Sequence, residues 1–432
     1  MASKVQIFNI SDLHIKGINF FGCQGNLADK VDKIVLEDTM FSNHNGTALE
    51  LSNCIMAHIT GSDFVLNKGS NYHGPTIKFL PADHGAAISA VRCVVRITDS
   101  GFEANSAKVG GAIFGALYSN ITIVNSTFVK NHASIIGGAL YTDSNCTVNI
   151  YNTTFKENKV EEDLDLSKGG VMYVRDSFVT IVSCTLSSNV GRAIFADTSS
   201  LSLNNTQGVM HAKYNNRVNV VDCQISSNSA DLGAFMYTSR NTTIFVSGWN
   251  FTNNTANKGG VFNLLVQINI NITNCRFSNN SASWGGVLHS KLRCVIRMQG
   301  VVINNNRGNQ GVLLFTNSEV YIYGKSIFEN NNGSIVVHYS NINFTENTTF
   351  ANNSLLSTLS NQAMYREGGA ITAFQSNIVF NGTFILMHNS AENGGAMLIT
   401  ESKVYINFMV IQQLPTTQHQ VMEGVSMSTR VS

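Results

Sequence analysis

Residues 102–131 read FEANSAKVGGAIFGALYSNITIVNSTFVKN. The motif Phe-x-x-Asn opens and closes this stretch, and Gly-Gly-Ala-Ile occupies residues 110–113. Between the motifs, Ile121 and Ile123 flank the polar Thr122. Such period-two alternation is typical of a β-strand with one buried face. The stretch therefore predicts a unit of strands and turns that ends where its next copy begins.

Both motifs recur along the chain, most clearly between residues 85 and 400, with a step that is most often about 26 residues. Phe-x-x-Asn occurs at Phe102/Asn105, Phe128/Asn131, Phe155/Asn158, Phe251/Asn254, Phe277/Asn280, Phe328/Asn331 and Phe350/Asn353. The glycine pairs are Gly110-Gly111, Gly137-Gly138, Gly169-Gly170, Gly259-Gly260, Gly285-Gly286, Gly368-Gly369 and Gly394-Gly395. Self-similarity at such a period indicates a solenoid.

Alignment of the copies on the phenylalanine reveals apolar columns seven and five positions before it. These columns contain Val95 and Ile97 in one copy, Ile121 and Ile123 in the next, and Tyr321 and Tyr323 near residue 328. A third column, two positions before the phenylalanine, holds Ser, Thr or Cys, so the chain must bend between two inward faces. The prediction is an all-β fold, a right-handed parallel β-helix solenoid of pectate-lyase-like type with about 15 coils of roughly 26 residues.

The domain prediction is one solenoid over residues 1–432, and we expect the chain to be a piece of a longer protein. Intervals longer than the repeat predict loop insertions near residues 161–168, 207–216 and 355–366.

The recurrent Asn and Gly residues have a structural interpretation. Glycine adopts left-handed backbone freely, asparagine tolerates it, and stacked asparagines can form hydrogen-bonded ladders. We therefore predict structural turn positions at Asn105, Asn131, Asn158, Asn254, Asn280, Asn331, Gly110, Gly111, Gly137, Gly138, Gly285 and Gly286.

Composition excludes some partners. Charged residues make up 13% of the chain and the net charge is +1, which argues against nucleic-acid binding. There is no apolar run long enough to span a membrane, so no membrane segment is expected. No motif indicates a cofactor, a metal site or a catalytic nucleophile, and we expect none of the three.

Asparagine is abundant, with 53 residues, and 17 of them begin an Asn-x-Ser/Thr sequon for N-glycosylation. Asparagine-rich turns beside threonine-rich strands can also generate sequons by composition alone. The candidate glycosylation sites are Asn120, Asn125, Asn145, Asn152, Asn241, Asn271 and Asn347. Asn125, Asn152 and Asn347 lie three positions before a phenylalanine, in a column that the alternation places outward.

Six of the eight cysteines share two columns of the repeat, and no pair has the spacing of a zinc site. Cys184, Cys223 and Cys275 occupy the small-residue column, and Cys93 and Cys146 lie two coils apart, too far for a disulfide. We interpret them as small buried ladder residues, although Cys184 and Cys223 could just reach each other.

The combined Gly-Gly-Ala-Ile/Leu and Phe-x-x-Asn motifs resemble the repeat of chlamydial polymorphic outer-membrane proteins and of animal right-handed β-helix proteins. The resemblance implies a surface location and, from the bacterial family, an adhesive role. We therefore expect an extracellular or cell-surface rod without enzymatic activity, with an unknown surface protein or glycan as its partner.

Two alternatives stay open: a bacterial surface passenger domain, and a polysaccharide lyase or hydrolase of the β-helix type. Such enzymes need clustered carboxylates. Here Asp99 and Asp222 share a column several coils apart, and Asp163 and Asp165 lie in an insertion.

Overall fold

A computed structural model describes residues 5–23, 25–69, 83–161, 169–187, 189, 193–204, 210–221, 224–354, 369–391 and 395–408. The chain divides into two compact units, Met1–Arg217 and Val218–Ser432. Among the described residues the elements are β-strands throughout. The expectation of one solenoid over residues 1–432 stays a prediction.

In the first unit, strands of successive coils pair in parallel into two long sheets, A and B, and a shorter sheet C. Sheet A contains β1 (Val5–Phe8), β4 (Asn26–Asp29), β7 (Leu49–Ser52), β10 (Ile88–Val91), β14 (Ile113–Ala116), β18 (Leu140–Asp143), β22 (Met172–Arg175), β25 (Ile194–Asp197) and β27 (Met210–Tyr214). Sheet B contains β2 (Asp12–Lys16), β5 (Lys33–Glu37), β8 (Met56–Thr60), β11 (Val94–Thr98), β15 (Asn120–Val124), β19 (Thr147–Tyr151), β23 (Phe178–Val182) and β26 (Ser200–Asn204). Sheet C contains β3 (Asn19–Phe21), β6 (Met40–Ser42), β9 (Asp63–Val65), β12 (Gly101–Glu103), β16 (Thr127–Val129), β20 (Thr154–Lys156) and β24 (Thr185–Ser187). A small sheet D contains β13 (Ser106–Val109), β17 (His132–Ile136) and β21 (Lys159–Val160).

The second unit repeats this arrangement, with sheet E in the place of C and sheet F in the place of D. Its sheet A contains β31 (Met236–Arg240), β35 (Phe262–Val266), β39 (Leu288–Ser290), β43 (Leu313–Thr316), β46 (Ile335–His338), β49 (Ile371–Phe374) and β52 (Met397–Thr400). Its sheet B contains β28 (Arg217–Val221), β32 (Thr243–Ser247), β36 (Asn269–Thr273), β40 (Val295–Gln299), β44 (Glu319–Tyr323), β47 (Asn341–Phe344), β50 (Asn377–Asn381) and β53 (Lys403–Phe408). Sheet E contains β29 (Gln224–Ser226), β33 (Asn250–Thr252), β37 (Arg276–Ser278), β41 (Val302–Asn304), β45 (Ser326–Glu329), β48 (Thr348–Ala351) and β51 (Phe384–Met387). Sheet F contains β30 (Ser229–Leu232), β34 (Thr255–Lys258), β38 (Ser281–Trp284) and β42 (Arg307–Gln310).

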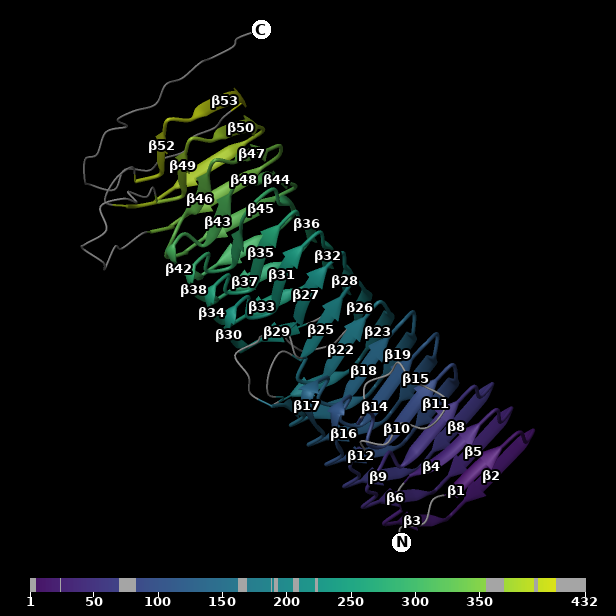
Figure 1. Ribbon diagram of the computed structural model, residues 1–432. Helices are drawn as coiled ribbons and strands as arrows, with labels where there is room; N and C mark the ends of the chain where they lie inside the picture. The colour runs from purple at the N-terminus through teal and green to yellow at the C-terminus, as the bar shows by residue number, and fades with distance from the viewer. Residues whose placement is uncertain are drawn as a thin grey trace. The chain divides into compact units, whose positions relative to one another are not determined.

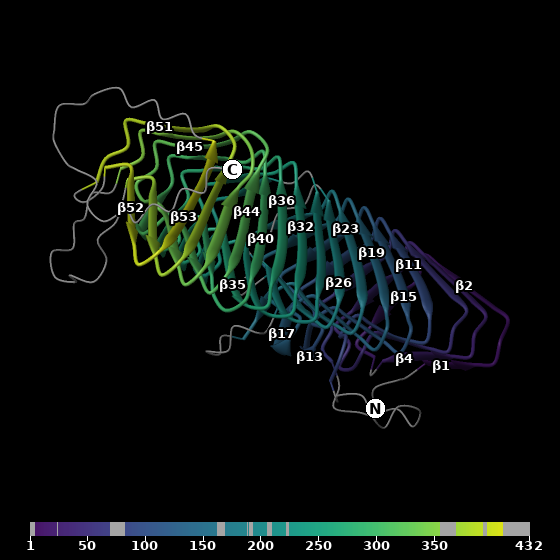
Figure 2. The same ribbon diagram turned by 90° about the horizontal axis from the view of Figure 1, so that it is seen from above.

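The parallel stacking of successive coils confirms the predicted all-β, parallel β-helix architecture in each unit. Within the first unit β11, β15, β19 and β23 lie side by side (Figure 1). The view from above shows the same relation for β32, β36, β40 and β44 of the second unit (Figure 2). An interior coil thus buries its apolar face against the coils on either side, whereas β1, β2 and β3 of the first coil are largely exposed.

Sheet B shows the predicted inward columns. Val95, Ile97, Ile121 and Ile123 are all at most 1% exposed. The prediction was wrong for one copy, because the coil before Phe328 carries an extra residue. There Val320 and Ile322 face inward, and Tyr321 and Tyr323 are only half-buried on the outer side.

The phenylalanines of the repeat stack as a ladder inside each unit. Phe102 lies 4.4 Å from Phe128, and Phe128 lies 4.8 Å from Phe155, between ring centroids. The stack continues toward the N-terminus through Phe64, Phe41 and Phe20, in coils with looser copies of the motif.

The asparagines after these phenylalanines form the predicted ladder. Asn131 Oδ1 accepts from the backbone N and the side-chain Nδ2 of Asn105, at 3.1 and 3.0 Å, and Asn105 Nδ2 also donates to the Phe64 carbonyl. The second unit repeats this pattern from Asn254 through Asn280 and Asn306 to Asn331.

The expected left-handed backbone at these asparagines was wrong. The positive φ belongs to the residue before each of them: Ala104, Lys130, Glu157, Asn253, Asn279 and Asn330. The asparagine itself needs ordinary backbone so that its amide points inward along the ladder.

The two glycines of each pair have different roles. Gly110, Gly137 and Gly285 have φ values of 59°, 67° and 62°, as predicted. Gly111, Gly138 and Gly286 are not left-handed, and for them the turn prediction needs correction. A Cβ at Gly111 would lie 2.1 Å from the Gly138 carbonyl oxygen, so the second glycine is required by close approach of the next coil.

The insertions at 161–168 and 355–366 lie, apart from Glu161, outside the described residues. The predicted insertion at 207–216 was wrong, because β27 (Met210–Tyr214) occupies it. Ile194 pairs in register with Met210, so the long interval before Asn228 contains one short additional coil.

Candidate functional site

The outer surface carries the features that bear on function, beginning with the sequons. Asn120, Asn125, Asn145, Asn152, Asn241 and Asn347 are exposed, and Asn271 is half-buried. Asn125 and Asn152 lie at left-handed turns between sheets B and C, where the side chain points to solvent.

The asparagines of the chain fall into two classes. Ladder members such as Asn105, Asn131 and Asn280 are completely buried, and no ladder asparagine from Asn67 to Asn389 begins a sequon. The described sequon asparagines all lie at exposed or half-buried positions instead. Asn204 is a sequon asparagine whose side chain is outside the described part.

The cysteines occupy the predicted buried columns. Cys54, Cys93, Cys146, Cys184, Cys275 and Cys294 are buried, and every cysteine that the structure describes is a free thiol. Burial raises the pKa of Cys146, Cys184, Cys275 and Cys294 to about 11. Cys223, the possible partner of Cys184, lies outside the described residues.

A cluster that the sequence did not reveal lies on the outer side of sheet A in the first unit. Arg175 Nε donates to Asp143 Oδ1 at 3.0 Å, and its Nη2 bonds the other carboxylate oxygen. Tyr141 Oη donates to Asp143 Oδ2 at 3.2 Å and stacks on Tyr173, with ring centroids 5.6 Å apart. Alignment on the glycine pairs would have found this ion pair, since Asp143 and Arg175 both lie five positions after a second glycine.

The electrostatics of the cluster favour a fixed ion pair. Burial alone would raise the pKa of the Asp143 carboxyl, but the hydrogen bonds and charge of Arg175 outweigh it and hold that pKa below its ordinary value. Burial also raises the pKa of Tyr141. The cluster offers one carboxylate, already neutralised by a guanidinium, whereas acid–base cleavage of a glycosidic bond needs a pair.

Metal binding has no candidate in the described ranges. There, no group of three or more His, Cys, Asp or Glu side chains is placed to hold an ion. Likewise, we found no helix in the described part that is long and apolar enough to cross a membrane.

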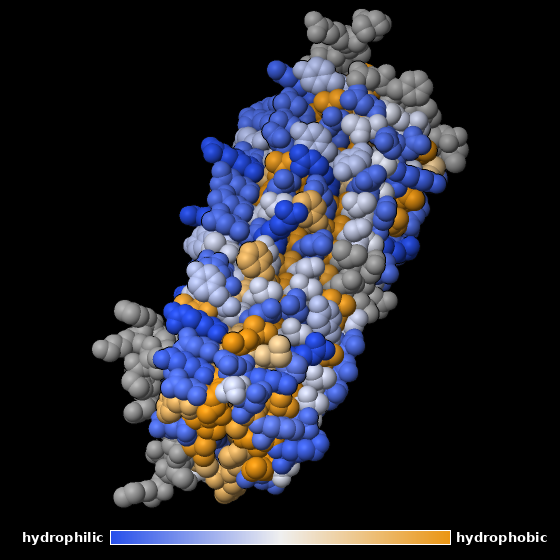
Figure 3. Space-filling view, turned by 90° about the vertical axis from the view of Figure 1, so that its right-hand side faces the viewer, coloured by the Kyte–Doolittle hydropathy of each residue, from blue (hydrophilic) through white to orange (hydrophobic). Residues whose placement is uncertain are grey.

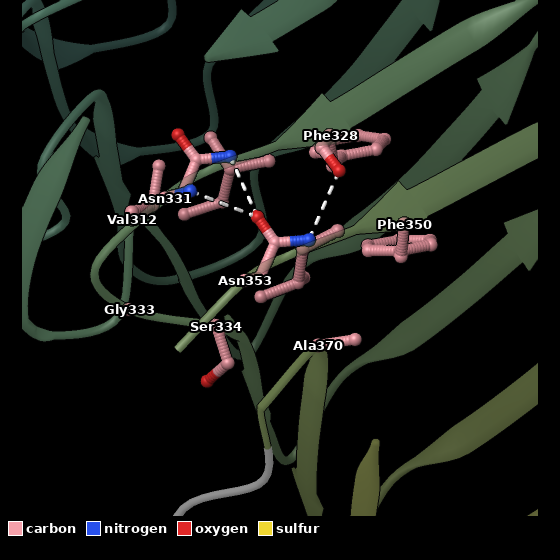
Figure 4. Close-up of a pocket in the computed structure, with 10 residues that line it drawn as sticks. Val312, Phe328, Asn331, Gly333, Ser334, Phe350, Asn353 and Ala370 are labelled. Carbon is pink, nitrogen blue, oxygen red and sulfur yellow. Dashed lines mark hydrogen bonds between the residues drawn. The ribbon is translucent and has the colours of Figure 1, made fainter. Parts of the chain in front are cut away.

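A cavity in the second unit lies between the asparagine ladder and sheet A (Figure 4). Phe328, Asn331, Phe350 and Asn353 line it, and its volume is about 10 Å³. Figure 4 shows the Asn353 amide fully engaged: its oxygen accepts from Asn331, and its nitrogen donates to the Phe328 carbonyl. The space suits at most one water molecule.

A larger, open pocket lies on the first unit at the corner between sheets A and B. Its volume is about 540 Å³, and its lining consists of Asn53, Cys54, Ile55, Arg92, Cys93, Val94 and Tyr118. Ile55, Val94 and Tyr118 are 64%, 43% and 72% exposed. Apolar side chains also gather in the lower part of the space-filling view, over the first coils of the chain (Figure 3). Contiguous exposed apolar patches often mark contact sites, whereas single exposed apolar residues are normal.

The comparisons with known proteins agree with the repeat. Residues 274–291 match the family model of the Chlamydia polymorphic membrane protein repeat. This segment contains Phe277, Asn280 and the Gly285-Gly286 pair, which are the two motifs in one copy. The chain thus carries a β-helix repeat resembling that of polymorphic outer-membrane proteins, as predicted.

Two other searches add little. No curated protein matches the chain. A solved structure, the receptor-binding protein (a tailspike) of bacteriophage Det7, aligns with 10% identity over 99% of this chain and 78% of that chain. Its TM-score is 0.15, and we base no argument on it.

Proposed function

We propose that this chain is an extracellular or cell-surface β-helix that displays loops and N-glycans for adhesion or recognition, without enzymatic activity. The observation that carries the proposal is that every sequon asparagine whose side chain the structure describes is exposed or half-buried, where a glycan can be attached.

The small size of the cavity in the second unit supports binding at an outer face. The second-unit cavity is too small for a sugar or a peptide, and stacked side chains fill the coils beside it. This cavity therefore does not hold such a ligand, and the proposal places the ligand on an outer face, as is common for solenoids.

The sequons also leave one side bare. None of the 17 falls in a described strand of sheets A, D or F, whereas Asn120, Asn250, Asn271 and Asn343 lie in strands of sheets B and E. Glycans would project from sheets B and E and the turns, and the sheet A side would stay open for a protein or glycan partner.

A binding experiment tests the adhesive role. The purified full chain is applied to panels of cells and matrix proteins, with and without enzymatic removal of N-glycans. We expect saturable binding to at least one surface. Absence of binding to every surface, by a chain shown to be folded, would count against the role.

The bacterial passenger domain is the second candidate, and the match at residues 274–291 to a chlamydial membrane protein repeat favours it. It predicts that the chain carries no N-glycans and that protease added to intact cells cleaves it. It also predicts that the same gene or a neighbouring gene encodes a β-barrel.

The absence of enzymatic activity needs its own test. The protein is incubated with uronate-containing and neutral polysaccharides, and new reducing ends and unsaturated products are measured. We expect neither product. Activity that Asp143→Asn abolishes would replace this proposal with a polysaccharide-cleaving enzyme.

A further inference from the structure

We infer that the N-glycan of Asn120 packs its first sugar rings into the open pocket beside Tyr118, and so covers an apolar patch of the first unit. The inference rests on the proposed function, because it requires glycosylation of Asn120. It adds a specific, noncovalent docking site for one glycan.

The fold places Asn120 at the edge of this pocket. Asn120 begins β15 and pairs in register with Val94, the exposed apolar residue of the preceding coil that lines the pocket. Tyr118, which also lines it, precedes Asn120 by two residues. The glycan attachment point thus has one lining residue beside it and another just before it in the chain.

The turn before Asn120 is held firmly. Leu117 and Tyr118 have φ values of 51° and 64°, and Tyr118 N donates to the Ser144 carbonyl at 2.9 Å. Ser119 Oγ donates to the carbonyls of Ala116 and Ala90 at 2.7 and 3.1 Å. These bonds fix the backbone from which the Tyr118 ring projects, so the ring offers a preorganised surface.

The chemistry of the pocket fits a sugar. Ile55, Val94 and Tyr118 provide apolar contact area, and tyrosine combines an apolar ring with a polar tip. Sugar rings likewise have an apolar face of C–H groups and a polar edge. Arg92 and Asn53 at the rim can hydrogen-bond that edge, and the volume of about 540 Å³ lies within the usual range of ligand pockets.

The lining identifies Asn120 as the source of the glycan instead of the nearby Asn145. The pocket residues come from segments 53–55 and 92–94, in the two coils before Asn120, and from Tyr118 in the same coil as Asn120. Asn145 lies in the coil after Tyr118, on the side away from Ile55 and Val94, and no residue of that coil lines the pocket, whereas Tyr118 of the Asn120 coil does.

The test uses the full chain secreted from eukaryotic cells, with four variants. Thr122→Ala removes the Asn120 sequon and keeps Asn120; Tyr118→Ala removes the ring; Tyr118→Phe keeps it; Thr147→Ala removes the neighbouring Asn145 sequon. For each protein, occupancy of Asn120 is measured by peptide mass spectrometry, together with the rate at which an endoglycosidase releases this glycan under native conditions.

We expect the Asn120 glycan to be released about tenfold more slowly than the Asn125 glycan. Tyr118→Ala should abolish the difference, and Tyr118→Phe and Thr147→Ala should preserve it. In thermal unfolding, Tyr118→Ala should lower Tm by about 2 °C in the glycosylated protein and leave Tm unchanged in the Thr122→Ala background.

Equal release rates at Asn120 and Asn125, or the same Tm effect of Tyr118→Ala in both backgrounds, would overturn the inference. An unoccupied Asn120 beside other occupied sequons would overturn it and leave the proposed function standing. If no sequon carried a glycan, the glycan display in the proposed function would fall as well.

Discussion

Asn158 Oδ1 accepts two hydrogen bonds from Asn131 in the preceding coil, one from its backbone N and one from its side-chain Nδ2, both at 3.0 Å. Asn131 Nδ2 also donates to the Phe102 carbonyl at 2.9 Å. Each ladder asparagine therefore satisfies buried backbone groups in other coils, which no apolar residue of similar size can do.

Replacement of a ladder asparagine should be costly. Asn131→Ala leaves the backbone N–H of Asn105 and the Phe102 carbonyl without these partners. We expect the free energy of unfolding to fall by about 2–4 kcal/mol, measured by denaturant unfolding of unglycosylated protein. The exposed Asn120→Ala is the control, with an expected change of less than about 0.5 kcal/mol. Equal effects of the two changes would contradict the ladder role.

The phenylalanine stack should tolerate aliphatic replacement better than truncation. Phe128 is fully buried between Phe102 and Phe155. Phe128→Ala should destabilise the protein by about 3–5 kcal/mol. Phe128→Leu should cost only about 1 kcal/mol, because Leu186 pairs in register with Phe155 in the same column. Denaturant unfolding of both variants checks the order, and a Leu variant as unstable as the Ala variant would contradict it.

The second glycine of each pair should not accept a side chain. Gly111→Ala places a Cβ 2.1 Å from the Gly138 carbonyl oxygen, so the backbone of two coils must shift. We expect a loss of more than about 3 kcal/mol. Gly17→Ala is the matched control: its φ is +65° and no atom lies within 4 Å of the added Cβ, so only strain of about 1 kcal/mol applies. Thermal unfolding of both variants tests this, and a mild effect at Gly111 would argue against close coil approach.

Stability should fall in alkaline solution because of the buried thiols. The pKa of Cys275 is about 11 in the folded chain and 9.0 as the reference value. As pH rises, the Cys275 thiol therefore loses its proton first in the unfolded chain. The stabilisation that the buried thiol contributes is complete below pH 9 and is lost as pH rises from 9 to 11. Between pH 8 and pH 10.5, the free energy of unfolding should fall by roughly 2 kcal/mol less in Cys275→Ala than in the unchanged protein. Denaturant unfolding at the two pH values measures both losses. The same loss in both proteins would contradict burial of this thiol.

The repeat was readable from sequence because its columns are physical layers of the fold. Phe128, Asn131 and Gly138 each occupy a position where only one or two residue types fit, so the residues recur visibly. The left-handed residue before each ladder asparagine has no common type in the first unit, where it is Ala104, Lys130 or Glu157, whereas in the second unit it is repeatedly asparagine, as at Asn253, Asn279 and Asn330. The strain there is held by hydrogen bonds of the neighbouring coils, which a single sequence does not show.

Other features were not predictable from the sequence, because they depend on which coils lie next to each other in the fold. The short coil between Ile194 and Met210 looked like an insertion, because it passes from sheet B back to sheet A without a phenylalanine. His44 takes the place of a ladder asparagine in the coil before Asn67, and its Nδ1 lies 2.9 Å from Asn67 Oδ1. Because the residue there is not asparagine, the sequence motif does not reveal this member of the ladder. The Asp143–Arg175 pair joins neighbouring coils, and alignment on the phenylalanine column does not show it, because Asp143 lies 12 positions before Phe155 and Arg175 lies 11 positions before Leu186.

The most direct test of glycan display on a β-helix is site-by-site glycan mapping of the native protein from its own cells. N-glycans are removed enzymatically in ¹⁸O water, and mass spectrometry of the peptides identifies each converted asparagine. We predict conversion at several of Asn120, Asn125, Asn145, Asn152, Asn241, Asn271 and Asn347, and none at ladder asparagines such as Asn131. A protein without any converted asparagine would contradict the account, and the bacterial passenger domain would become the better explanation.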